Sequence, residues 1–170
     1  TDPLIASNVV GIALTGGVAL QIFTIDSFNA SGFTLTITFG GTILVVDDER
    51  SVRMMLEAAL RAQGHRIFCA ASGSGARTLL EAESFDLILL DLQLGDMDGI
   101  EILCEVKERW PAIEVILLTA HGSINSAIAA LRLGAFDYLL KPAQLQDIRE
   151  RVERGLEQRQ VALQRGELLQ

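Results

Sequence analysis

The sequence predicts an α/β fold: a (βα)5 doubly wound parallel sheet with an N-terminal antiparallel β appendage and an extended C-terminal helix. From residue 42 onward, five short apolar runs alternate with helical patterns, as expected for a parallel sheet covered on both faces. Composition breaks near Gly40-Gly41, because only two acidic and no basic residues precede it, whereas 20 acidic and all 14 basic residues follow. Ionisable side chains also follow several apolar runs, at the strand ends where open α/β sheets bind ligands.

Residues 1–41 are expected to form a β-rich appendage with three strands, near 9–15, 18–26 and 33–39. Gly16-Gly17 is a hairpin signal, and residues 27–32 predict a longer turn. A three-stranded meander is only marginally stable alone, so we expect it to pack on something, such as another copy. The composition break also leaves open that this segment is foreign, joined by engineering or cloning.

The stretch from residue 3 to residue 25 carries no charge and is long enough to span a bilayer. It contains several glycines and polar residues and lacks a basic flank. These features disfavour both a membrane span and a signal peptide.

The β-α units are expected to occupy residues 42–157, and their boundaries follow from turn and capping signals. The expected strands are 42–46, 66–70, 86–90, 114–118 and 136–140. The expected helices between them are 50–63, 73–83, 98–109 and 123–133. Glycine marks two helix C-termini, serine marks two N-termini and a Trp-Pro pair ends the third helix: Gly64, Gly134, Ser72, Ser123 and Trp110-Pro111.

The last segment, from Gln144, is expected to be one long helix, because Leu145, Ile148, Val152 and Leu156 recur at helical spacing. Residues 158–170 would extend it beyond the sheet. The extension could be a dimerising coil, a linker to another domain or a frayed, solvated terminus.

Five side chains at strand ends are the candidate functional site: Asp47, Asp48, Asp91, Thr119 and Lys141. Parallel strands bring their carboxyl ends to one edge of the sheet, so these side chains are expected to converge. Carboxylates hold a hard cation, and a hydroxyl and an ammonium suit an anion beside it. This combination is what phosphoryl transfer requires.

The motifs around these residues resemble the receiver domains of two-component response regulators. The matching segments are ILVVDDE at 43–49, LDLQLGDMDG at 90–99, LTA at 118–120 and FDYLLKP at 136–142. The resemblance covers about residues 42–157, and residues 119–142 look most like receivers of NtrC-type regulators, which drive AAA+ transcription activators. One departure is Gly95, where many members have proline; it loosens a loop but removes no chemical group.

The resemblance implies a strand order of 2-1-3-4-5 and a role for each site residue. Asp91 would be the phosphoacceptor. Asp48, Asp91 and the backbone carbonyl of Gln93 would ligate Mg²⁺, with Asp47 reaching the ion through water. Lys141 would pair with a phosphoryl oxygen, Thr119 would hydrogen-bond another, and the Lys141-Pro142 bond would be cis.

The resemblance also implies a switch. Thr119 would move toward the phosphoryl group, and Tyr138 would then turn inward. The changed surface would lie on 123–133, 136–140 and the start of the last helix. Implied partners are a sensor histidine kinase or phosphotransfer protein, and a second copy of the chain.

Other features limit the function. A net charge of −8 disfavours nonspecific contact with nucleic acid or anionic membranes. Cys69 and Cys104 match no metal-ligand spacing and are interpreted as reduced core thiols of a cytoplasmic protein. His65 is expected at the surface, and His121 could lie beside the site.

An aspartyl phosphatase and the receiver of a hybrid kinase are the alternatives to a response regulator. An aspartyl phosphatase of the haloacid dehalogenase type needs an acid two residues after its nucleophile, where this chain has Gln93. We therefore expect a phosphorylated switch rather than a turnover enzyme. The C-terminal receiver of a hybrid histidine kinase remains an alternative, although residues 1–41 are too short for a kinase ATP-binding domain.

Overall fold

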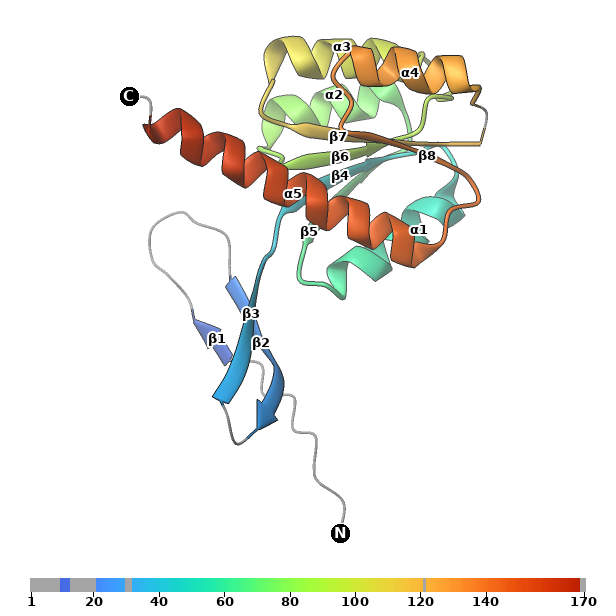
Figure 1. Ribbon diagram of the computed structural model, residues 1–170. Coiled ribbons are helices and arrows are strands. Elements are labelled where there is room, and N and C mark those ends of the chain that lie inside the picture. Colours follow the sequence, from blue (N-terminus) through green and yellow to red (C-terminus); the bar gives the residue numbers. More distant parts are fainter. Residues whose placement is uncertain (1–9, 13–20, 30–31, 121, 169–170) are drawn as a thin grey trace.

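The structure is a computed structural model that describes residues 10–12, 21–29, 32–120 and 122–168 (Figure 1). Two sheets are present in these residues, and they share no strand. The first consists of β1 (Val10–Ile12), β2 (Gln21–Asn29) and β3 (Gly32–Phe39). The second consists of β4 (Thr42–Val46), β5 (Arg66–Ala70), β6 (Leu87–Leu90), β7 (Glu114–Thr119) and β8 (Asp137–Leu140). The helices are α1 (Arg50–Arg61), α2 (Gly73–Ala82), α3 (Gly99–Arg109), α4 (Ile124–Arg132) and α5 (Leu145–Leu168).

The second sheet is parallel, and its strand order is β5-β4-β6-β7-β8. Counted within this sheet, the order is 2-1-3-4-5, which confirms the expected doubly wound topology. Helices α2, α3 and α4 cover one face, and α1 and α5 cover the other (Figure 1). Helices therefore cover both faces of the central strands, as the continuous apolar runs of these strands predict.

The strands divide their side chains between two core layers. In β4, Leu44 and Val46 belong to the cluster that includes residues of α2 and α3, whereas Ile43 and Val45 belong to the cluster with α1 and α5. All four residues are at most 1% exposed. Burying one such aliphatic side chain contributes about 1.5–3 kcal/mol relative to leaving it exposed, so this alternation holds the strand ends at a defined edge.

The predicted helix signals are confirmed. Gly64 and Gly134 have φ of 89° and 100°, the left-handed backbone that glycine adopts without strain after a helix. Ser72 Oγ accepts a hydrogen bond from the backbone N–H of Gly75 at 3.0 Å. Ser123 and Ser126 form a reciprocal capping box at the start of α4.

Helix α5 is a single helix of 24 residues, as expected. Its first half is held by the buried side chains of Ile148 and Val152. Farther along, Arg159 pairs with Asp86 at 2.9 Å, while the other oxygen of Asp86 accepts the backbone N–H of Thr42 at 2.8 Å. Residues 161–166 beyond this anchor are exposed.

The β appendage differs from expectation in one turn. The long turn expected at 27–32 is wrong, because β2 continues to Asn29 and β3 begins at Gly32, with Phe28 opposite Phe33. Aromatic residues favour extended strands, and this pairing leaves only two residues for the connection. The expected Gly16-Gly17 hairpin lies outside the described residues.

Gly41, just before β4, is buried, and a Cβ atom there would lie 2.7 Å from Leu156 Cδ2. Two expectations about single residues are wrong. His65 is buried at 5% exposure rather than on the surface; its Nδ1 accepts the Gly41 N–H at 3.0 Å, and burial lowers its pKa. Cys104 lies exposed on α3 rather than in the core, and Cys69 is half-buried. Local sequence patterns missed the burial of His65 because its contact with a distant residue, Gly41, decides it.

Among the described residues, none of the helices combines the length and apolar character needed to cross a bilayer. The described part of the uncharged stretch is strand rather than helix.

Candidate phosphoryl-transfer site

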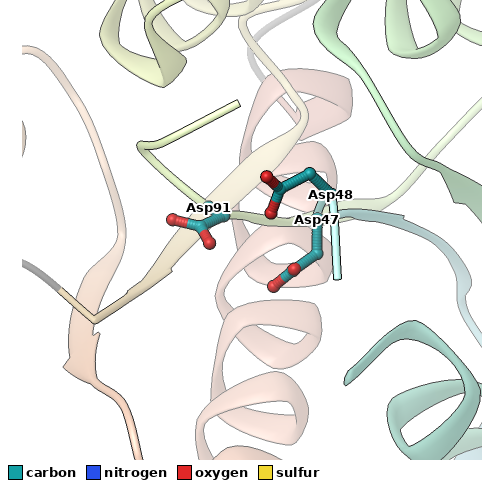
Figure 2. Close-up of side chains that lie close together, drawn as sticks. All are labelled: Asp47, Asp48 and Asp91. Carbon is teal, nitrogen blue, oxygen red and sulfur yellow. The ribbon is translucent and has the colours of Figure 1, made fainter. Parts of the chain in front are cut away.

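Three carboxylates meet at the carboxyl ends of two neighbouring strands (Figure 2). Asp47 and Asp48 follow β4, and Asp91 follows β6. The two strands pair in parallel with Val46 opposite Leu90, so both chains end at the same level of the sheet. One oxygen from each carboxylate lies within 4.8 Å of the other two.

Lys141 brings a cation to this cluster from the end of β8. Its Nζ lies 2.5 Å from Asp47 Oδ2 and 2.8 Å from Asp91 Oδ2. The backbone N–H of Lys141 also donates to the carbonyl of Thr119 at 2.9 Å. The Lys141-Pro142 peptide bond is cis, as expected. Residues far apart in the sequence are thus joined in one ion-pair network.

The acidic side chains of the cluster differ in how deeply they are buried. Asp47 and Asp91 are 3% and 6% exposed, whereas Asp48 is exposed. Burial raises the pKa of the Asp47 carboxyl, against the lowering effect of its hydrogen bond with Lys141. For Lys141, burial alone would lower the pKa, but its hydrogen bonds with Asp47 and Asp91 raise it above its usual value. The ammonium therefore stays charged and balances two buried acids.

Local hydrogen bonds orient the two buried acids. The backbone N–H of Glu49 donates to Asp47 Oδ1 at 2.9 Å, and that of Gln93 donates to Asp91 Oδ1 at 3.0 Å. Each carboxylate therefore receives an amide from the residue two positions ahead, a pattern typical of aspartate turns. Both side chains are held before any ligand binds.

Arg53 is a site neighbour that the sequence analysis missed. Its Nη1 donates to the backbone carbonyl of Asp47 at 2.7 Å and to that of Asp48 at 2.9 Å. This guanidinium on α1 thereby holds the turn that carries both acids. No motif marks it, because an arginine in the first turns of a helix is usually a solvated surface residue.

The remaining candidate residues flank the carboxylates. Thr119 ends β7 and is fully buried. Tyr138 on β8 is half-buried, and its hydroxyl lies 3.5 Å from Ser126 Oγ. The hydroxyl also lies against Gly122, where a Cβ atom would overlap it. Gln93 is exposed in the loop that follows Asp91, and His121 lies outside the described residues.

The arrangement combines oxygen ligands at one point with a fixed cation beside them. Three carboxylates without histidine or thiolate suit a hard divalent ion such as Mg²⁺, which takes oxygen ligands and retains waters. The exposure of Asp48 leaves the cluster open to solvent on its side. A carboxylate, a set of oxygen ligands suited to a divalent ion and an ammonium in one place are the groups that phosphoryl transfer uses.

Residues 43–153 match the model of the response regulator receiver domain family, which is well over half of the chain. The chain belongs to this family. Receiver regions of NtrC-type regulators are among its relatives. This chain is 41% identical over 114 residues to the transcriptional regulatory protein ZraR of Escherichia coli strain K12, and the match covers 67% of this chain and 26% of ZraR. The chain is also 37% identical over 122 residues to the alginate biosynthesis regulator AlgB of Pseudomonas putida, covering 72% of this chain and 27% of AlgB. The chain thus spans about a quarter of the length of these relatives.

Solved receiver structures agree with this assignment. The beryllofluoride-activated NtrC4 receiver domain dimer matches with a TM-score of 0.67 and 31% identity, covering 69% of this chain and 98% of that one. The fold and the family therefore place this receiver domain in two-component signalling.

Proposed function

We propose that this receiver domain accepts a phosphoryl group on Asp91 from a sensor histidine kinase or a phosphotransfer protein. The observation that carries the proposal is the contact of Lys141 with both Asp91 and Asp47 beside a third carboxylate. A carboxylate oxygen of Asp91 attacks the phosphorus of a phosphohistidine. The new O–P bond forms as the P–N bond breaks, and the imidazole leaves.

Mg²⁺ fits the donor set at this site. Asp48, Asp91 and the Gln93 backbone carbonyl would hold the ion, with Asp47 reaching it through water. When bound, the ion neutralises charge between the phosphoryl group and the acids. Lys141 then pairs with a phosphoryl oxygen, and Thr119 donates a hydrogen bond to another.

The acids and the lysine should differ in what they contribute. In Asp48→Ala a metal ligand is lost, so the Mg²⁺ dissociation constant should rise at least about tenfold. In Lys141→Ala the ligands remain, so Mg²⁺ should bind at least as tightly as in wild type, while phosphorylation by acetyl phosphate slows. Calorimetric Mg²⁺ titration and the rate of labelling separate the two effects. Equal loss of Mg²⁺ affinity in both variants would contradict this division of roles.

We propose that Thr119 and Tyr138 transmit the effect of phosphorylation to the surface of the domain. Tyr138 is on the strand next to β7, and its hydroxyl reaches Ser126 of α4. A change in the position of the ring would therefore alter α4 directly. Beryllofluoride should shift the Tyr138 ring resonances of wild type, and most of that shift should be lost in Thr119→Ala. Unchanged resonances in wild type would exclude the coupling.

The altered surface is proposed to bind a second copy of the chain. Ile128 and Leu131 on α4 and Leu140 on β8 are exposed apolar residues on this side, and the related NtrC4 receiver domain forms a dimer. The exposed residues Val161 and Leu163 extend the apolar series of α5. Light scattering should show a larger species for the full chain than for a chain ending at Glu157; equal masses would rule out a role for the extension.

A further inference from the structure

The loop from Asp91 to Asp98 carries the proposed phosphoacceptor and the Gln93 carbonyl. Its two ends are fastened near α3: Gln93 forms a bridge with Asp98, and the Gly99 N–H donates to the Leu92 carbonyl at 2.8 Å. The middle of the loop contains Gly95, where a Cβ atom would meet nothing within 4 Å. A glycine in open space has more conformational freedom to lose than any other residue. The tip of the loop therefore needs an anchor of its own.

Asp96 supplies that anchor by binding a different helix. Its Oδ1 accepts the backbone N–H of Gly73 at 2.9 Å, and its Oδ2 accepts that of Ser74 at 2.9 Å. These are the first two amides of α2, which have no partner within the helix. Hydrogen bonds from these two amides lower the pKa of the Asp96 carboxyl to about 2, and the amide of Ser74 has the larger effect. Asp96 is therefore ionised, and able to accept both bonds, over the whole neutral and mildly acidic range.

Packing beside Asp96 also holds the loop against the start of α2. The side chain of Met97 lies against Gly73 so closely that any Cβ atom at Gly73 would collide with it. Gly73 itself is buried. The third amide of α2, that of Gly75, is bound by Ser72 Oγ instead. Two side chains therefore cap one helix end, and of these two it is Asp96 that comes from the loop.

We propose that Asp96 is a positioning residue of the metal and phosphoacceptor site: its two-oxygen contact with the start of α2 holds the Asp91–Asp98 loop and the Gln93 carbonyl in place. The inference rests on the proposed function, because it concerns the same site. Both oxygens of Asp96 face amides of α2, and Asp96 is not a member of the acid cluster, so it acts only through the loop.

The test compares Asp96→Ala with Ser72→Ala. Both variants remove a cap from α2 and should lower its stability, but only Asp96→Ala frees the loop. The Mg²⁺ dissociation constant, measured by calorimetry on protein without phosphodonor, should rise about tenfold in Asp96→Ala and stay at the wild-type value in Ser72→Ala. Labelling by acetyl phosphate at saturating Mg²⁺ should approach the wild-type rate in both.

Two further variants complete the test. Asp96→Asn keeps one acceptor oxygen, so its Mg²⁺ dissociation constant should lie between those of wild type and Asp96→Ala. This variant still tests the proposal if the alanine variant does not fold. Gly95→Pro combined with Asp96→Ala should recover Mg²⁺ affinity, because proline restricts the freed loop. Wild-type affinity in a folded Asp96→Ala, or an equal loss in Ser72→Ala, would overturn the inference. A wild-type protein that binds no Mg²⁺ would instead overturn the proposed function, and the inference with it.

Discussion

Lys141→Ala is expected to lower the free energy of unfolding by about 3–5 kcal/mol at neutral pH without Mg²⁺, the usual cost of removing one partner from a buried ion pair. The ammonium contacts two carboxylates whose side chains are only 4% and 7% exposed. Removing it leaves both acids buried without their cation. Urea unfolding monitored by circular dichroism would measure the loss.

The loss of unfolding free energy in Lys141→Ala should depend on pH in a definite direction. Burial already raises the pKa of Asp47 above its ordinary value of 3.8, and losing Lys141 removes the contacts that oppose this rise. A carboxyl with a raised pKa in the folded state favours folding when it is protonated. The difference from wild type should therefore be largest near neutral pH and shrink as the pH falls toward 4.

Mg²⁺ and a surface control make the stability test specific. Saturating Mg²⁺ should restore part of the stability of Lys141→Ala, because an ion that binds only the folded state stabilises it. Arg154→Ala removes a positive charge from an exposed position on α5 and should change stability by less than about 0.5 kcal/mol. Equal effects of the two substitutions would contradict the role given to Lys141.

Gly99→Ala is expected to disturb the site through the backbone beside Asp91. A Cβ atom at Gly99 would lie 2.5 Å from the Asp91 carbonyl oxygen and 2.7 Å from Leu92 Cα. Both contacts are with backbone, so the chain next to Asp91 must move. Such overpacking costs about 1–3 kcal/mol, and a shift near 1 Å can slow a reaction by about 100-fold. Acetyl phosphate labelling and urea unfolding would measure the two losses.

Gly95→Ala is the matched control for this prediction. Gly95 lies four residues before Gly99, within the Asp91–Asp98 loop; it has no positive φ, and a Cβ atom there would have free space. Its stability and labelling rate should remain close to wild type, with any change in stability below about 0.5 kcal/mol. A Gly99→Ala protein that matches Gly95→Ala in both measurements would show that the close approach of α3 to Asp91 has no consequence.

The arrangement of the site was largely predictable because it follows from the strands. The run Ile43–Val46 has to be a buried strand, so Asp47 must stand at its carboxyl end, and the same reasoning places Asp91 and Thr119. Parallel pairing then brings the strand ends together without further information. The contact between Lys141 and Asp91 follows from topology, although the two residues are 50 positions apart.

The residues that hold the site were not predictable, because their partners are backbone groups of distant segments. Arg53 bonds carbonyls of the β4–α1 turn, and Asp96 bonds amides at the start of α2. Neither contact leaves a periodic or spaced pattern in the sequence. His65 was misplaced for the same reason: its hydrogen bond with the Gly41 N–H depends on how β4 and β5 begin side by side.

The most direct test of the account is the intact mass of the protein after incubation with acetyl phosphate and Mg²⁺. Wild type should gain the mass of one phosphoryl group, and hydroxylamine should remove it, as expected for an acyl phosphate. Asp91→Asn should gain none under the same conditions, and wild type should gain none when the Mg²⁺ is chelated. Equal labelling of wild type and Asp91→Asn would contradict the assignment of Asp91 as the phosphoacceptor.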